Sequence, residues 1–163
     1  MRLLIIRHGD PDYSIDSLTE KGWREAELLS ERISKLDVKA FYCSPLGRAK
    51  DTASLTLKKM GREAEILDWL KEFYYCQVKL PYIKEGTALT WDLLPSFFTN
   101  IDDLYDKEKF KDVDFMREGN YPELYRNVTD GLDALLEKHG YRRCGRYYEA
   151  VEPNRDTILS FRN

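Results

Sequence analysis

The chain has 163 residues, a length that favours a single domain. With 42% hydrophobic and 34% charged residues it has enough apolar material for a core, which excludes a low-complexity disordered chain. The net charge of −3, from 26 Lys and Arg against 29 Asp and Glu, gives the whole chain no attraction to nucleic acid or to an anionic membrane. No apolar run approaches the roughly 20 residues of a membrane span, so we expect neither nucleic acid nor a membrane as a partner.

The cysteines indicate a reducing compartment. Cys43, Cys76 and Cys144 are odd in number and widely spaced, without a Cys-x-x-Cys pair or metal-ligand spacing. The apolar run at 3–6 is too short for the core of a signal peptide. We therefore expect a cytoplasmic protein with free thiols and no bound metal.

The first elements are a strand and a helix. The apolar run at 3–6 predicts a short strand, buried in a sheet that is covered on both faces. Thr19 suits the N-cap of a helix that runs to about Leu36. Its buried stripe is predicted at three-to-four spacing: Trp23, Ala26, Leu29 and Ile33.

A second strand and helix follow. The strand is predicted at 40–43, with Ser44 as the N-cap and Pro45 at the first position of the next helix. Gly61 suits a left-handed residue at the end of that helix. A third strand is predicted over 64–70.

The later elements complete an α/β pattern. A helix over 124–138 is opened by Pro122 and closed by Gly140, and strands are predicted at 147–151 and 157–159. Alternating strands and helices predict an α/β fold with a mostly parallel sheet and helices on both faces, in three layers.

The stretch over 77–116 interrupts the alternation. It contains Pro and Asp among many aromatic residues: Tyr82, Trp91, Phe97, Phe98, Tyr105, Phe110 and Phe115. We interpret it as an insertion packed over the active-site end of a single domain that spans 1–163.

Two short motifs carry candidate chemistry. Arg7, His8 and Gly9 directly follow the first strand, and ligands of open α/β sheets bind beyond the carboxyl ends of the strands, where an imidazole suits attack on phosphorus. Arg48 lies in the first turn of the second helix, where free N–H groups and a guanidinium favour a phosphate. The alternatives are a solvent-facing histidine in a loop and a surface arginine on an ordinary helix.

Together, the two motifs resemble those of the histidine phosphatase superfamily, the phosphoglycerate-mutase-like group. The Arg-His-Gly motif at 7–9, the segment 18–22 that opens the first helix and the segment 42–53 match its signatures. Glu72 stands where many members carry an acidic proton donor, and the resemblance covers 1–75 well.

The resemblance implies a role for each residue. His8 would be the nucleophile and would carry a transient phosphoryl group, while Arg7 and Arg48 would hold the phosphate oxygens. Glu72 would be the general acid and then the general base. The implied ligand is a small phosphorylated substrate or inorganic phosphate, and no metal or cofactor is required because the arginines neutralise the charge. Asp10 and Asp12 compete with Glu72 for the role of the acid.

The chain departs from the family at its second catalytic histidine. His139 and the glycine after it look like that motif, but they end the predicted helix and suit a helix terminus. The proper place follows 157–161, where the chain has Arg162 and Asn163 and then ends, without the family's next helix. The chain is then a truncated product, a short variant in which Arg162 supplies the positive charge, or a degenerate member that binds phosphate.

These departures shape the expected function. The leading hypothesis is phosphomonoester hydrolysis through a phosphohistidine at His8, weak because the second histidine is missing. The alternatives are mutase-type phosphoryl transfer and a non-catalytic binder of a phosphorylated ligand. A sheet without its covering helix exposes apolar surface, so a homodimer that covers this face is also predicted.

Overall fold

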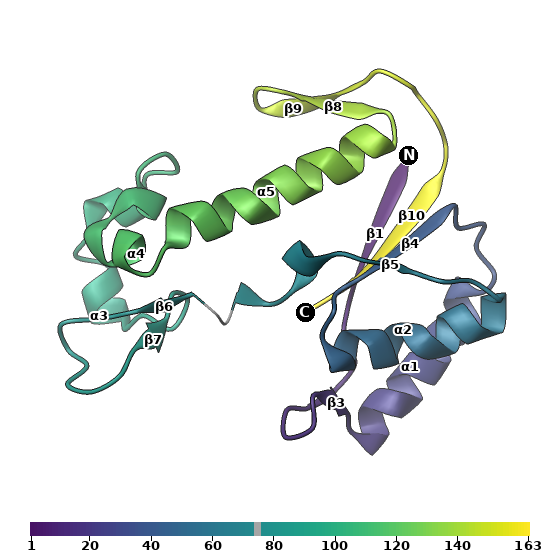
Figure 1. Cartoon of the computed structure of the whole chain (residues 1–163), viewed down its shortest axis with the longest axis horizontal. Coiled ribbons are helices and arrows are strands. Elements are labelled where there is room, and N and C mark those ends of the chain that lie inside the picture. The colour runs from purple at the N-terminus through teal and green to yellow at the C-terminus, as the bar shows by residue number, and fades with distance from the viewer. Residues whose placement is uncertain (74–75) are drawn as a thin grey trace. The chain divides into compact units, whose positions relative to one another are not determined.

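The computed structural model describes residues 1–73 and 76–163 (Figure 1). The chain forms two compact units. Unit 1 combines Met1–Glu72 with Asp133–Asn163, and unit 2 is Phe73–Leu132. Within the described ranges, none of the helices has the length and apolar character that crossing a membrane requires.

Unit 1 is built on a four-stranded parallel sheet. Its strands are, in spatial order, β1 (Arg2–Arg7), β10 (Thr157–Arg162), β4 (Ala40–Cys43) and β5 (Glu65–Ile66). Every neighbouring pair is parallel. This arrangement confirms the predicted α/β class with a parallel sheet.

The last strand of the chain is a central strand of this sheet. β10 lies between β1 and β4 and is longer than the predicted strand at 157–159. Its first five residues are all buried, because strands flank it on both sides and side chains pack on both faces. β10 therefore carries the core of unit 1.

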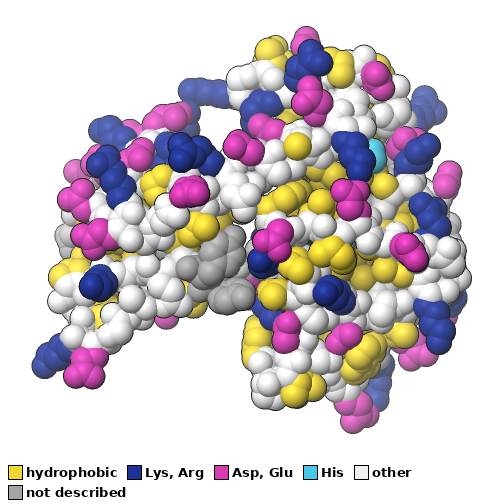
Figure 2. All heavy atoms as spheres, viewed as in Figure 1, with side chains coloured by type: hydrophobic (Ala, Val, Ile, Leu, Met, Phe, Trp, Pro, Cys, Tyr) yellow, Lys and Arg dark blue, Asp and Glu magenta, His cyan; other side chains and the backbone are white. Residues whose placement is uncertain are grey.

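β1 is an edge strand, and the prediction that it is fully buried was wrong. Its burial alternates along the strand, and Ile5 is 57% exposed. Hydrophobic side chains gather at the surface over the strands of unit 1 in Figure 2. The homodimer proposed to cover such a surface stays a prediction.

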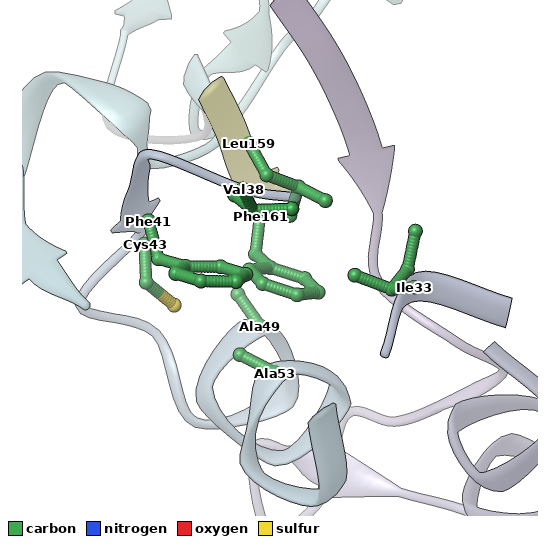
Figure 3. Packing of buried hydrophobic residues seen from close by; sticks show 8 residues of the cluster. All are labelled: Ile33, Val38, Phe41, Cys43, Ala49, Ala53, Leu159 and Phe161. Atoms are coloured by element: carbon green, nitrogen blue, oxygen red, sulfur yellow. The ribbon is translucent and has the colours of Figure 1, made fainter. Parts of the chain in front are cut away.

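Two helices, α1 (Glu20–Ile33) and α2 (Gly47–Met60), run beside each other and cover one face of the sheet (Figure 1). In Figure 3 the rings of Phe41 and Phe161 lie side by side above Ala49 and Ala53 of α2. The small alanine side chains let the helix approach the sheet closely, so that both aromatic rings are buried.

α1 confirms its predicted cap and corrects its predicted stripe. Thr19 accepts a hydrogen bond from the backbone N–H of Gly22, but the helix ends at Ile33 rather than at Leu36. Trp23 is 38% exposed, and the buried positions are Gly22, Ala26, Ser30 and Ile33. The reason is a close backbone approach: a Cβ on Gly22 would lie 2.2 Å from the carbonyl oxygen of Asp10.

α2 begins later than predicted. Its N-cap is Leu46, while Ser44 is fully buried in the turn before it and accepts a hydrogen bond from the Leu46 N–H at 3.3 Å. Ser44 as N-cap and Pro45 as the first helical residue were therefore wrong. The predicted end of this helix was correct, since Gly61 is the C-cap of α2 with φ 61°.

The other face of the sheet packs against the C-terminal part of α5 (Tyr121–Lys138). Tyr42, Leu70, Leu135 and Ile158 form its buried cluster. The third predicted strand is shorter than expected, because β5 covers only Glu65–Ile66 and a 3-10 turn, η1 (Asp68–Leu70), follows it. After α5, β8 (Tyr141–Cys144) and β9 (Tyr147–Ala150) form an antiparallel hairpin.

Unit 2 is held by aromatic contacts among short elements. Phe97 packs against Tyr82 and Phe115, and Phe110 packs against Tyr121 and Tyr125. Its elements before α5 are β6 (Gln77–Val78), β7 (Ala88–Leu89), α3 (Pro95–Phe98), η3 (Asp102–Tyr105), η4 (Phe110–Asp112) and α4 (Asp114–Glu118). The compact unit is broader than the predicted insertion at 77–116, and its position over the active-site end stays a prediction.

The three thiols are free, and burial separates their reactivity. Cys43 and Cys76 are buried and Cys144 is exposed. Burial raises the pKa of Cys43 to about 11. Because the thiolate is the reactive form, we expect iodoacetamide to modify Cys43 at least about 100-fold more slowly than Cys144 in the folded protein. Peptide mapping after labelling in mild alkali measures both rates. Labelling in denaturant is the control, and equal rates in the folded protein would contradict the burial of Cys43.

Candidate active site

The candidate residues follow the carboxyl ends of parallel strands, which lie at the same end of the sheet. His8 follows β1, and its backbone N–H donates to the carbonyl oxygen of Arg162 at 3.0 Å. Ser44 follows β4, and its N–H donates to the Phe161 carbonyl at 2.9 Å. The pairing of the strands thus continues beyond their ends and fixes the backbone beneath the site.

The His8 ring is oriented by its own loop. The side chain is buried, and Nδ1 lies 2.7 Å from the carbonyl oxygen of Gly9. Because a carbonyl can only accept, Nδ1 carries the hydrogen of this bond, and in the neutral ring Nε2 carries the lone pair. The Gly9 N–H donates to Thr52 Oγ1 at 3.0 Å, and that hydroxyl donates to the Arg48 carbonyl at 2.7 Å. These bonds connect the loop after β1 to the first turn of α2.

The Arg48 side chain is the centre of a network of hydrogen bonds. It is only 8% exposed, and its guanidinium donates to Asp16 Oδ1 at 2.6 Å and to Glu72 Oε2 at 2.8 Å. With the amide of Asn163 oriented to satisfy its neighbours, the side-chain oxygen of Asn163 accepts from Arg48 Nε at 2.8 Å. The Tyr13 ring lies 5.3 Å from the guanidinium carbon. The predicted residues Arg48 and Glu72 are therefore in direct contact.

Asp16 is a member of this network that the sequence did not reveal. Its Oδ2 accepts from the backbone N–H of Gly47 at 2.6 Å, at the N-terminus of α2. Partial burial raises the pKa of Asp16, but hydrogen bonds from Gly47 and Arg48, together with the Arg48 charge, outweigh that effect and lower it. Asp16 is thus an ionised carboxylate beside Arg48. No spacing in the sequence pairs the two, since they lie in different elements.

Asp10 and Asp12, the competitors for the acid role, have other partners. Asp10 Oδ2 accepts from the hydroxyl of Thr19 at 2.7 Å, and this bond lowers the pKa of Asp10. Asp12 accepts from the hydroxyl and the N–H of Ser14, and these bonds lower its pKa. Both carboxylates are thus bonded within the loop and the start of α1, whereas Glu72 contacts Arg48.

Two arginines lie side by side at the ends of β1 and β10. Arg7 is the register partner of Arg162, and paired residues of neighbouring strands point to the same face. Arg162 Nε donates to the carbonyl oxygen of Asn163 at 3.0 Å. Over the part of the chain that the structure describes, neither guanidinium has an ion pair. Arg7 and His8 lie at the same end of the sheet as Arg48, and among the described residues no hydrogen bond or ion pair joins either side chain to it.

His139 lies at the end of a helix, as predicted. It follows the last residue of α5, next to Gly140 with φ 84°. Its Nε2 lies 2.7 Å from the hydroxyl of Tyr42, on the face of the sheet covered by α5. Burial, and then the charge of Lys138, lower the pKa of His139.

Comparison with known proteins identifies the family. The family model of the histidine phosphatase superfamily (branch 1) matches residues 3–144. The chain belongs to the histidine phosphatase superfamily. It is 34% identical over 70 residues to a 2,3-bisphosphoglycerate-dependent phosphoglycerate mutase of Thermoplasma acidophilum. This match covers 37% of the chain and 35% of that protein.

A second relative of the chain is an adenosylcobalamin/alpha-ribazole phosphatase of Salmonella typhi. It is 29% identical over 96 aligned positions, and the match covers 53% of the chain and 48% of that protein. The match thus spans less than half the length of either curated relative. Among solved structures, the alpha-ribazole phosphatase from Shigella flexneri superposes with a TM-score of 0.57 and 18% sequence identity. The superposition covers 99% of this chain and 74% of the Shigella flexneri chain. That likeness confirms the predicted fold.

Proposed function

We propose that the chain hydrolyses a small phosphomonoester through a phosphohistidine at His8. The observation that carries the proposal is the orientation of the His8 ring, since the bond from Nδ1 to the Gly9 carbonyl leaves Nε2 as the atom with the lone pair. An imidazole so held, at the carboxyl edge of a parallel sheet, suits a nucleophile. Membership of the histidine phosphatase superfamily supports the same role.

The proposed reaction has two steps. In the first, Nε2 of His8 forms a bond to phosphorus while the bond to the leaving alcohol oxygen breaks, and Glu72, after leaving Arg48 and taking up a proton from solvent, gives that proton to the oxygen. In the second, water attacks phosphorus, the Glu72 carboxylate takes a proton from the water, and the bond to His8 breaks. Arg7 and Arg48 neutralise the phosphoryl oxygens in both steps.

Turnover by this chain is proposed to be slow. The chain has two histidines, and the bond of His139 to Tyr42 on the α5 face supports the proposal that His139 does not act as a second histidine at the site. Arg162, beside Arg7, offers a positive charge at the sheet edge instead. A second candidate is a non-catalytic binder of phosphate, favoured by the ion pair that holds the Glu72 carboxylate against Arg48 and so keeps it from donating a proton.

Trapping the phosphoenzyme tests the proposal. We expect brief incubation with p-nitrophenyl phosphate, followed by an alkaline quench, to place one phosphoryl group on the peptide that contains His8. The chain has only one other histidine, so mass spectrometry of the two histidine peptides assigns the position. Stoichiometric phosphate binding without any phosphoenzyme would support the binder instead. A phosphoryl group on the His139 peptide would refute the role of His8.

A further inference from the structure

A carboxylate of the chain already occupies the proposed phosphate ligand Arg48. Each oxygen of Asp16 has its own donor: Oδ1 accepts from the Arg48 guanidinium and Oδ2 from the Gly47 N–H, both at 2.6 Å. Short, charge-assisted bonds of this kind are those that phosphate oxygens make with an arginine and a backbone N–H. Asp16 and a bound phosphate therefore need the same donors.

The backbone around Asp16 is shaped to deliver its carboxylate there. Asp16 has φ 49°, a left-handed conformation that is unfavourable for a residue other than glycine. Its carbonyl oxygen approaches Gly47 so closely that a Cβ on that glycine would lie 2.0 Å away. Next to it, the Ser17 hydroxyl donates to Asp51 Oδ2 at 2.5 Å and anchors the turn to α2. The position of the carboxylate is thus determined by the fold of the loop.

The Asp16 carboxylate is nevertheless partly open to solvent. Its side chain is 43% exposed. The neighbouring Tyr13 and Ile15 are also exposed, so little burial is lost when the 13–16 turn moves. While Asp16 stays, Arg48 faces two carboxylates, because Glu72 holds its other side. A phosphate dianion then meets net negative charge at this guanidinium.

We propose that Asp16 competes with the substrate phosphate for Arg48 and so sets the affinity of the site. This inference rests on the proposed function, which makes Arg48 a phosphate ligand. Binding requires that the Asp16 carboxylate leaves the guanidinium. The apparent dissociation constant then exceeds the intrinsic one by the inverse of the fraction of molecules in which Arg48 is open.

Phosphate titration of two variants tests the competition. We expect Asp16→Asn to bind inorganic phosphate about 10-fold more tightly than the unaltered chain, measured by calorimetry, because the competing charge is gone. Asp16→Gly removes the carboxylate and also suits the positive φ, so it keeps the test available if the amide variant unfolds. The matched control is Asp12→Asn, the same change of charge in the same loop, which should leave the affinity unchanged.

The outcomes separate this inference from the proposed function. Folded Asp16 variants that bind phosphate no more tightly than the unaltered chain would overturn the competition, while the phosphoenzyme at His8 still formed. A gain shared by Asp12→Asn would also overturn it, because the effect would then be one of overall charge. Absence of both phosphate binding and phosphoenzyme from every variant would instead refute the proposed function. For p-nitrophenyl phosphate, competition predicts that Asp16→Asn lowers KM, whereas a merely structural role predicts no gain.

Discussion

Replacing His8 with alanine should lower kcat/KM for p-nitrophenyl phosphate by at least about 1,000-fold, because the variant has no atom in place of Nε2 to bond to phosphorus. The Arg48 network does not involve the His8 side chain, so the variant should keep the affinity for inorganic phosphate within a few-fold. Initial rates and phosphate titration of the same preparation measure the two effects separately.

The other histidine supplies the control. In His139→Ala the ring lost is the one bonded to Tyr42, on the face of the sheet covered by α5. Its kcat/KM should stay within about 3-fold of the unaltered value, since in the described part of the chain no hydrogen bond or ion pair joins His139 to the proposed site. Equal losses of activity in the two variants would contradict a nucleophile at His8 and indicate a shared effect on folding.

Replacing Phe161 with alanine should lower the free energy of unfolding by about 3–5 kcal/mol. Phe161 is fully buried in the central strand, and its ring lies beside that of Phe41, above the alanines of α2 (Figure 3). Ala49 and Ala53 are too small to fill the cavity that the substitution leaves. Urea unfolding followed by far-ultraviolet circular dichroism measures the change.

Ile5→Ala is the matched control for this substitution. It removes a large apolar side chain from the neighbouring strand, but Ile5 is 57% exposed. The expected loss is below about 1 kcal/mol, because an exposed side chain leaves no cavity. If Ile5→Ala destabilised the protein as much as Phe161→Ala, the assignment of β10 to the core and β1 to the edge would be wrong.

Local signals explain most of the predicted elements. Thr19 caps α1, Gly61 ends α2 with positive φ, and Gly140 follows α5, because each of these effects depends on residues within one turn of the chain. The strands predicted at 3–6 and 40–43 are likewise visible in the sequence as short apolar runs. The candidates His8 and Arg48 could be found from sequence because their motifs directly follow such strands.

Long-range pairing explains what the sequence left open. The 157–159 strand looks short and terminal, yet in the structure it is central, because its partners are strands more than a hundred residues earlier. Trp23 is displaced from the buried stripe because the Asp10 backbone packs against the preceding glycine. Neighbouring residues in the sequence therefore predict neither the central position of β10 nor the exposure of Trp23.

The candidate site shows the same division. The residue types at 7, 8, 48 and 72 follow from motifs in the sequence, and so does their placement near strand ends. Only the tertiary structure shows that Arg48 is neutralised, since Asp16 lies 32 residues and Glu72 lies 24 residues from it along the chain. A charge is fixed by the residue type, but the partner that compensates it depends on which distant segments the fold brings within hydrogen-bonding distance.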